Sequence, residues 1–239
     1  MSFDSYKFHP SSLGLIMTES RTKEPIGETA KAHLLQCWIE EKYGRRKDIS
    51  NKYIEKGIAQ EEESITLYSL VTKKFHKKNT ETISNDFFVG TPDLYDGASV
   101  TEAELIIDIK TSWDIFTFFQ VLQKPVNKNY YWQLQAYMDL TGASRAKLVY
   151  CLVDTPINLI EDEKRKLAWA MNVIDPEASP EYQTKCQQIE KNMMFVDIPK
   201  QDRYIAFEFE RNQADIDKAH ERVLECRDFL NLFSLSRGL

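Results

Sequence analysis

Two opposite charges interrupt an apolar segment of the sequence. Residues 105–113 read LIIDIKTSW, in which Asp108 and Lys110 stand within a run of β-strand type. Alternate residues of a strand share a face, so Asp108 and Lys110 point to one side while Ile107 and Ile109 pack on the other. Burying an ionised side chain is costly unless it is compensated. The pair is therefore either a structural ion pair or part of a site that binds a cation.

The composition predicts a folded protein. The chain has 239 residues, of which 42% are hydrophobic and 28% charged, and can bury a substantial core as one globular domain. A formal net charge of −6 argues against a uniformly basic surface, although nucleic-acid binding depends on local charge. Basic islands lie at residues 42–47, 73–78 and 164–166. Each is equally consistent with solvated helix ends and loops.

The cysteines and histidines are scattered, four of each, without a C-x-x-C pair. This spacing favours neither a disulfide nor zinc, and an iron–sulfur cluster usually needs closer cysteines. The N-terminus lacks the apolar segment of a secretion signal, and no apolar run approaches the about 18 residues of a membrane span. We expect a cytoplasmic protein without a membrane partner. Buried thiols explain the cysteines, Cys37, Cys151, Cys186 and Cys226.

Hydrophobic periodicity predicts an alternation of helices and strands. Ser50 can cap a long helix over residues 51–75 that has Glu61 in its middle. Three strands in a meander are expected next. The expected helices cover residues 28–44, 51–75, 130–142, 156–171 and 213 onward. The expected strands cover residues 82–90, 91–96, 103–111, 146–154 and 203–210. Residues 176–183 are expected to form a loop or short helix.

This order places several polar residues on consecutive elements of one α/β unit. Asp93 begins the middle strand, and Asp108 follows it by 15 residues on the next strand. Neighbouring strands lie about 4.8 Å apart, so a suitable register lets Asp93 and Asp108 reach one divalent cation. Such a cation would compensate both carboxylates. Lys110 on the same face could then hold the water or phosphate that the metal polarises.

Each of these residues also has a purely structural interpretation. Asp93 follows a proline and could be an ordinary turn acid. Glu61 belongs to an acidic run, residues 61–63, of the kind that usually forms a solvated helix face. Gln133 and Gln135 could both be exposed helix residues, and Gln135 is the alternative to Gln133.

Four short motifs resemble those of one nuclease superfamily. TPD, ending at Asp93, followed by DIK at 108–110 resembles the PD-(D/E)xK motif of restriction-endonuclease-like nucleases. GIAQE at 57–61 and QLQAY at 133–137 resemble the branch that contains RecB, YqaJ and lambda exonuclease. The order of the motifs and the element types that carry them match the family. The resemblance covers about residues 5 to 155.

The resemblance implies an α/β fold with a restriction-endonuclease-like core, in which helices flank a central mixed β-sheet. We expect residues 1–239 to form a single nuclease domain. Its core motifs lie at about residues 50–155, a helical segment that contacts the DNA end lies at 1–49, and further helices and strands lie at 156–239.

The resemblance also implies roles for the motif residues. Lys110 would position or help to deprotonate the attacking water, and Gln133 would orient Lys110 or a phosphate. Magnesium prefers oxygen ligands and keeps several waters, which suits such a set, and manganese is an expected substitute. The implied metal ligands are Asp93, Asp108, Glu61 and the backbone carbonyl of Ile109.

Three residues are expected to contact DNA: Ser12, Thr111 and Tyr131. The segment at 9–21 resembles the one with which lambda-type exonucleases grip a DNA end, and Ser12 matches its phosphate-contacting serine. The upstream arginine of that pattern is missing, with Ser5 and Lys7 nearby. A wedge or base-stacking platform could come from Trp113, Phe116, Phe118, Phe119, Tyr130, Tyr131 or Trp132.

The resemblance implies a Mg²⁺-dependent DNA exonuclease that acts on linear double-stranded ends in phage or prophage recombination or repair. A single-strand annealing protein is an expected partner, and a trimeric ring is an expected assembly. One alternative is an endonuclease or a RecB-type module of a larger repair complex. The other is a catalytically inactive DNA-binding protein of the same fold, which retention of the motif residues disfavours.

Overall fold

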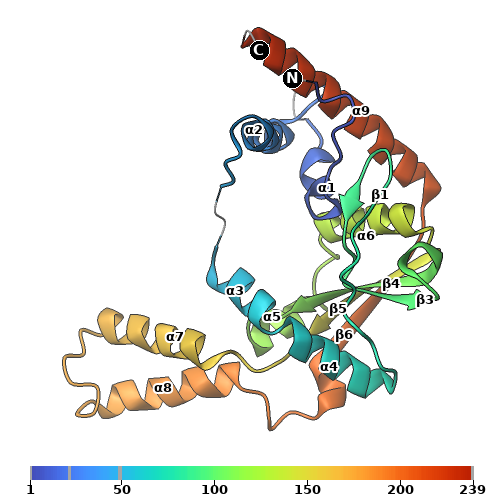
Figure 1. Ribbon diagram of the computed structural model, residues 1–239. Coiled ribbons are helices and arrows are strands. Elements are labelled where there is room, and N and C mark those ends of the chain that lie inside the picture. The colour runs from blue at the N-terminus through green and yellow to red at the C-terminus, as the bar shows by residue number, and fades with distance from the viewer. Residues whose placement is uncertain (1, 21–22, 48–49, 238–239) are drawn as a thin grey trace.

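A four-stranded mixed sheet forms the centre of the computed structural model, which describes residues 2–20, 23–47 and 50–237 (Figure 1). The central pair, β4 and β5, is parallel, and both outer pairs are antiparallel. The predicted mixed sheet is confirmed. The strands, in their order across the sheet, are β3 (Leu94–Gly97), β4 (Ala103–Thr111), β5 (Arg145–Cys151) and β6 (Tyr204–Glu210).

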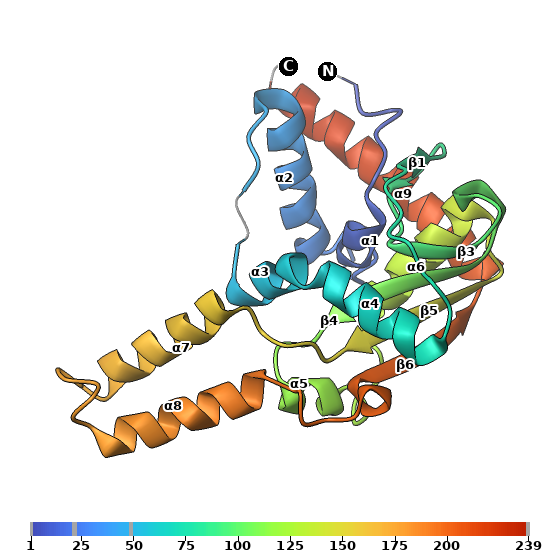
Figure 2. The same ribbon diagram turned by 60° about the horizontal axis from the view of Figure 1, so that its bottom comes forward.

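Helices α4 (Glu61–Thr72) and α6 (Lys128–Thr141) cover opposite faces of this sheet (Figure 2). Ile107 and Ile109 belong to the core on the α4 side, whereas Ile106 belongs to the core on the α6 side. Because strand residues alternate between faces, Asp108 points to the α6 side together with Ile106. The predicted alternation along this strand is confirmed.

The connection between the parallel strands β4 and β5 contains two helices. A parallel pair needs a crossover of this kind. The first helix, α5 (Ile115–Gln120), was not expected from the hydrophobic pattern, and it begins with a reciprocal capping box between Asp114 and Thr117. The second helix, α6, ends as predicted at Gly142, whose φ of 79° is left-handed.

The prediction of one continuous helix over residues 51–75 is wrong. It consists of α3 (Lys52–Ala59) and α4, which are separated at Gln60, where the backbone is not helical. Glu61 is therefore the first residue of α4 rather than the middle of a long helix. The N-cap of α3 is Asn51, not Ser50, because the Asn51 side chain accepts two backbone N–H bonds of the first turn.

The predicted three-strand meander is also wrong. Its first segment forms a separate two-stranded sheet of β1 (Ile83–Ser84) and β2 (Val89–Gly90). The Asn85 side chain accepts the backbone N–H groups of Phe87 and Phe88 and so stabilises the turn. Phe88 is fully buried in a core that the N-terminal segment shares, and this packing holds the hairpin away from the main sheet. A short 3-10 helix (Val100–Glu102) precedes β4.

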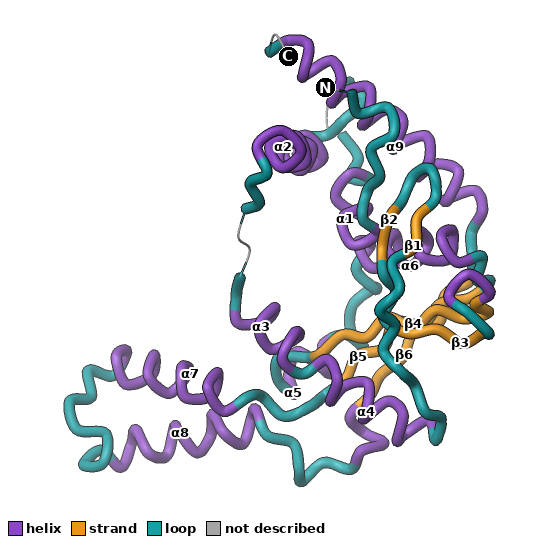
Figure 3. The backbone as a smooth tube through the Cα atoms, in the orientation of Figure 1, coloured by secondary structure: helices purple, strands orange, loops and turns teal. Residues whose placement is uncertain are grey.

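A second core lies beyond the α6 side of the sheet. It joins the N-terminal segment to α1 (Pro10–Ile16), α2 (Glu28–Tyr43) and α9 (Gln213–Ser236), and Figure 3 shows these helices on one side of the strands. Helix α1, which was not predicted, packs closely on α6. A Cβ atom on Gly14 would lie only 2.5 Å from Asn129 Cα.

The segment between β5 and β6 forms a helical hairpin that extends from the body of the molecule (Figure 1). Pro156 precedes α7 (Ile157–Ala170), as predicted. The second helix, α8 (Pro180–Met193), is a full helix where a loop or short helix was expected. Ser179 accepts the Tyr182 N–H and so supplies its N-cap. A 3-10 turn (Lys200–Arg203) then leads into β6.

Two expectations from composition can be compared with the described parts of the chain. All four cysteines are buried and unpaired there. Among the same residues, no helix combines the length and apolar character needed to cross a bilayer.

Candidate active site

Asp93 and Asp108 face each other across the β3–β4 pair. The register pairs Leu94 with Ile107, which places Asp93 opposite Asp108 one step further along. Asp93 Oδ2 also accepts the Ile109 backbone N–H at 2.8 Å. The strand register is therefore the one that two carboxylates need in order to share a cation.

Asp108 is almost fully buried, with its side chain 1% exposed. Its Oδ1 accepts a hydrogen bond from Gln133 Nε2 at 2.8 Å. Its Oδ2 lies 2.7 Å from Lys110 Nζ, which pairs with it as an ammonium ion. A carboxylate oxygen has two lone pairs, so Oδ2 keeps coordination capacity beyond this ion pair.

Lys110 lies between a carboxylate and an aromatic ring. Its Nζ is 2.7 Å from Asp108 Oδ2 and 4.9 Å from the centre of the Tyr130 ring. Burial lowers the pKa of Lys110, but attraction to Asp108 and Asp93 outweighs it, so the net shift is upward. Lys110 therefore carries its positive charge and can donate hydrogen bonds to a phosphate or a water.

The two facing carboxylates also affect each other. Burial and the neighbouring Asp108 carboxylate raise the pKa of Asp93 to about 7, although Lys110 and the Ile109 N–H oppose the shift. Removing water and adding a like charge both disfavour the ionised form. An additional positive charge at this position would favour the ionised form of Asp93.

A pocket of about 550 Å³ opens beside this cluster. Helix α3 supplies one wall, and the aromatic side chains of Trp113, Tyr130 and Tyr150 supply others. Of the predicted site residues, Asp93, Ile109, Lys110, Thr111 and Glu61 line this pocket.

Glu61 reaches the pocket but is engaged elsewhere. Its carboxylate accepts a hydrogen bond from Lys78 Nζ at 2.6 Å. Within residues 2–20, 23–47 and 50–237, no three acidic, histidine or cysteine side chains are grouped closely enough to hold a metal. The structure thus brings together the Asp93–Asp108 pair and leaves Glu61 bound to Lys78.

The structure distinguishes the two candidate glutamines. Gln133 contacts Asp108, whereas Gln135 donates to the Glu210 carbonyl and accepts the Asn212 N–H. Gln135 therefore fastens α6 to the end of β6. Both glutamines are buried, so neither is the exposed helix residue of the structural interpretation.

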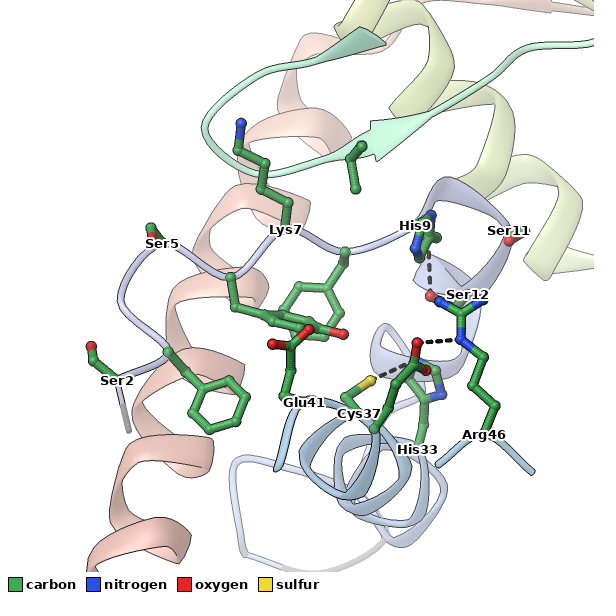
Figure 4. A pocket seen from close by; sticks show the side chains of 15 residues that line it. Ser2, Ser5, Lys7, His9, Ser11, Ser12, His33, Cys37, Glu41 and Arg46 are labelled. Atoms are coloured by element: carbon green, nitrogen blue, oxygen red, sulfur yellow. Dashed lines mark hydrogen bonds and ion pairs between the residues drawn. The ribbon is translucent and has the colours of Figure 1, made fainter. Parts of the chain in front are cut away.

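Ser12 and Tyr131 lie outside this pocket. The Tyr131 hydroxyl donates to Asp215 at 2.5 Å and so points to α9. Ser12 lines a second pocket, shown in Figure 4, and its hydroxyl donates to the His9 carbonyl at 2.9 Å. Ser5, Lys7, His33, Cys37 and Arg46 also line this second pocket.

Sequence reasoning did not assign two residues that belong to the pocket region. Tyr130 was grouped only with the neighbouring aromatics, although it precedes Gln133 by three residues and therefore shares its helix face. Lys56 is 1% exposed, and its Nζ donates to the Trp113 carbonyl at 2.8 Å. No local pattern distinguishes Lys56 from the exposed lysines around it.

The donor set fits a hard divalent cation. Asp93, Asp108 and the Ile109 carbonyl offer only oxygen atoms, which Mg²⁺ and Mn²⁺ prefer. Asp108 Oδ2, although paired with Lys110, has a second lone pair with which it could bind a cation.

The mixed sheet flanked by helices, with Asp93 and Asp108 facing each other beside Lys110, is consistent with the PD-(D/E)xK nuclease fold. Among solved structures, the chain is similar to a phage-related exonuclease from Haemophilus somnus 129PT, with 27% sequence identity and a TM-score of 0.75 over 98% of this chain and 97% of that chain. The resemblance inferred from the motifs is thereby confirmed.

The chain is also similar in fold to the alkaline exonuclease LHK-Exo from Laribacter hongkongensis, with 16% identity and a TM-score of 0.64 over 98% of this chain and 94% of that chain. A structure of LHK-Exo in complex with dAMP gives 17% identity and a TM-score of 0.63 over 97% and 92% of the two chains. Neither protein-family models nor curated protein sequences match this chain. Together with the site, the similar structures support a nuclease.

Proposed function

We propose that this protein is a Mg²⁺-dependent exonuclease that hydrolyses DNA from its ends. The observation that carries the proposal is the pair of facing aspartates, Asp93 and the buried Asp108, with Lys110 Nζ 2.7 Å from the Asp108 carboxylate. Asp93 and Lys110 line the adjoining pocket, which gives a phosphate access to these two side chains. The relative LHK-Exo has been solved with dAMP, a deoxynucleotide, which supports DNA as the substrate.

In this proposal, Asp93, Asp108 and the Ile109 carbonyl hold the cation, with Mn²⁺ as a possible substitute. When bound, the cation supplies charge stabilisation at the scissile phosphate and lowers the pKa of a bound water. Lys110 donates to a phosphate oxygen or to the attacking water and orients it. The neighbouring Asp108 and Asp93 carboxylates raise the pKa of Lys110 in the cation-free protein, which suits the positioning role, and help in deprotonating the water stays the alternative.

Gln133 has a supporting role in the proposed reaction. Its amide donates to Asp108 Oδ1, which directs the other carboxylate oxygen toward Lys110. Glu61 remains a proposed third carboxylate ligand, and it would have to exchange Lys78 for the cation.

The proposed DNA contacts lie in the catalytic pocket and in the second pocket. Thr111 lines the catalytic pocket, and its hydroxyl is 2.8 Å from that of Ser64. Ser12 would contact DNA at the second pocket, beside Lys7. Tyr130, rather than Tyr131, offers a ring to the catalytic pocket, because Tyr131 is bound to Asp215.

A digestion assay tests the proposed activity. Linear duplex DNA should be degraded in Mg²⁺ or Mn²⁺, covalently closed circular DNA should persist, and excess chelator should stop the reaction. Asp108→Asn should abolish both digestion and calorimetrically measured cation binding, because it removes a charged ligand. Cleavage of the closed circle would instead support the endonuclease or RecB-type alternative. Digestion in excess chelator would contradict the metal site.

The biological setting is also a proposal. We propose a role in phage or prophage recombination or repair in the host cytoplasm, because the similar Haemophilus somnus protein is described as phage-related. Co-purification with a single-strand annealing protein encoded beside it would support this setting. If the unaltered chain binds DNA but digests none in any divalent cation, the inactive DNA-binding alternative is favoured.

A further inference from the structure

The basic segment at residues 73–78, KKFHKK, touches the proposed catalytic site only through the pairing of Lys78 with Glu61 among the described contacts. It follows α4 directly (Figure 1) and surrounds Phe75 with lysines. Phe75 is 85% exposed, although burying a phenylalanine side chain is normally favourable. An exposed aromatic ring among cations is typical of a surface that binds nucleic acid.

The position of Phe75 is held by the residue that follows it. His76 is buried, its ring stacks on Tyr68 with 4.9 Å between ring centres, and its N–H donates to Ser69 Oγ at 3.1 Å. Phe75 and Lys77 are both exposed, on either side of buried His76. The anchored histidine therefore presents Phe75 and Lys77 to the solvent.

Two of the four lysines in this segment are paired with carboxylates, and two are not. Lys74 pairs with Asp96 and Lys78 pairs with Glu61, each at 2.6 Å. The ammonium groups of Lys73 and Lys77 have no ion-pair partner anywhere in the described chain. The segment is thus a local positive surface on a protein whose formal net charge is −6.

A groove of about 630 Å³ runs along this segment. Ile65, Leu70 and Phe75 give it apolar walls, and the lysines lie at its edge. The groove is linked to the catalytic pocket by an ion pair, because Lys78, which lines the groove, lies 2.6 Å from Glu61, which lines the pocket. A strand in this groove would therefore lie on the Glu61 side of the proposed site of hydrolysis.

We propose that residues 73–78 bind single-stranded DNA beside the catalytic pocket. Phe75 stacks on an unpaired base, and Lys73 and Lys77 bind phosphates. A single strand is the occupant that fits, because bases within a duplex are already stacked on one another and offer no free face. The inference rests on the proposed function, in which digestion of one strand from an end exposes the other.

Fluorescence anisotropy with the full chain tests the proposal. The probe is a labelled oligothymidylate of about 20 nucleotides, longer than the largest typical single-strand site of one domain, in chelator so that it is not cleaved. Loss of one base stack predicts that Phe75→Ala weakens binding about 5- to 150-fold, while Phe75→Trp retains it. Changing Lys73 and Lys77 to glutamine should reduce the slope of log affinity against log salt by about 1.4.

Matched variants provide the controls. Trp169→Ala removes an aromatic side chain on α7 that is equally exposed, at 85%, and should bind like the unaltered chain. Changing Lys185 and Lys191, two exposed lysines on the projecting helix α8, to glutamine alters the net charge equally and should leave the salt slope unchanged. A duplex of the same length should respond far less to Phe75→Ala than the single strand does.

Three results would overturn the proposal. These are absence of binding to the oligothymidylate, equal affinity of Phe75→Ala and the unaltered chain, and an equal loss in Trp169→Ala or on duplex DNA. Digestion of linear duplex is scored separately. If the chain digests linear duplex but binds the oligothymidylate equally well without Phe75, only this inference is wrong. If binding depends on Phe75 but the chain digests no DNA, only the proposed exonuclease activity is wrong.

Discussion

At the residue scale, the decisive feature is the environment of Asp108. Its burial removes hydration, and Gln133 and Lys110 contact its two oxygens. An apolar residue of similar volume would avoid that desolvation cost. The proposed role of this carboxylate as a cation ligand therefore explains its position better than a contribution to stability does.

Lys110→Ala should separate cation binding from catalysis. The variant should remain folded and keep cation binding, because both aspartates remain, while DNA digestion should fall about 10²–10³-fold, as when one donor to a reacting oxygen is lost. Lys110→Arg should not restore digestion, because a planar guanidinium does not replace a compact ammonium. Calorimetry and a nuclease assay measure the two effects.

Lys147→Ala is the matched control. Lys147 also lies on a strand and pairs with a carboxylate, Glu208, at 2.8 Å, and its side chain is 27% exposed against 24% for Lys110. The Lys147→Ala variant should digest DNA at the rate of the unaltered chain. Near-normal digestion by Lys110→Ala would assign the Asp108–Lys110 contact to a structural ion pair only.

At the element scale, the attachment of α3 positions one wall of the catalytic pocket. Lys56 links α3 to the Trp113 carbonyl at the start of the α5 connection, and its ammonium lies 5.4 Å from the centre of the Phe195 ring. Burial lowers the pKa of Lys56 to about 7, although Asp114 and Asp154 act to raise it. The charge of this lysine therefore opposes folding.

This shift predicts a pH dependence of stability. Between about pH 7 and pH 10 the Lys56 side chain is protonated in the unfolded chain and deprotonated in the folded chain. The free energy of unfolding should therefore rise with pH in this range. Lys56 alone contributes at most about 1.4 kcal/mol per pH unit to this rise. Lys56→Met should lose that increment in denaturant titrations across this range. Lys191→Met, at an exposed lysine, should keep the full rise of the unfolding free energy with pH. If this free energy changed equally with pH in Lys56→Met and in the unaltered chain, the rise would not come from Lys56.

The contact between α1 and α6 depends on a glycine. An added methyl group at Gly14 would meet the Asn129 backbone, which cannot move aside as a side chain can. Gly14→Ala should therefore lower the free energy of unfolding by about 1–3 kcal/mol in a denaturant titration. Gly57→Ala on α3 is the control: a Cβ there meets no atom within 4 Å, so it should be neutral or slightly stabilising. Equal stability of the two variants would contradict the close contact.

At the scale of the whole molecule, the N-terminal segment and the β1–β2 hairpin depend on the far end of the chain. Arg227 on α9 donates to the carbonyls of Tyr6 and Asp86, and Asn231 accepts the Phe3 N–H at 2.7 Å. The residues after 155, expected as additions to the core, thus supply both an edge strand and the helix that holds the N-terminal segment.

The proposed assembly is tested on the intact molecule. If the chain forms the ring expected from its lambda-type resemblance, light scattering at working concentration should give the mass of three chains, and dilution should not reduce digestion until the trimer dissociates. A monomer mass under conditions of full digestion would contradict a functional trimer.

Local periodicity predicted one feature of the candidate site, and the family resemblance supplied others. Alternation along 105–113 placed Asp108 and Lys110 on one face, which depends on backbone geometry over a few residues, whereas the resemblance of the motifs selected Asp93 and Gln133. The pattern did not predict the break at Gln60 or the separate β1–β2 hairpin, because tertiary packing of α4 and Phe88 decided both.

The sequence by itself determined which residue types could bind a cation and on which strands they lie. Only the tertiary structure decided which of them meet: it joined Asp108 to Gln133, bound Glu61 to Lys78, and turned Tyr131 toward Asp215. These partners are separated by 25, 17 and 84 residues. Contacts over such distances depend on how the elements pack, which the periodicity of each element does not encode.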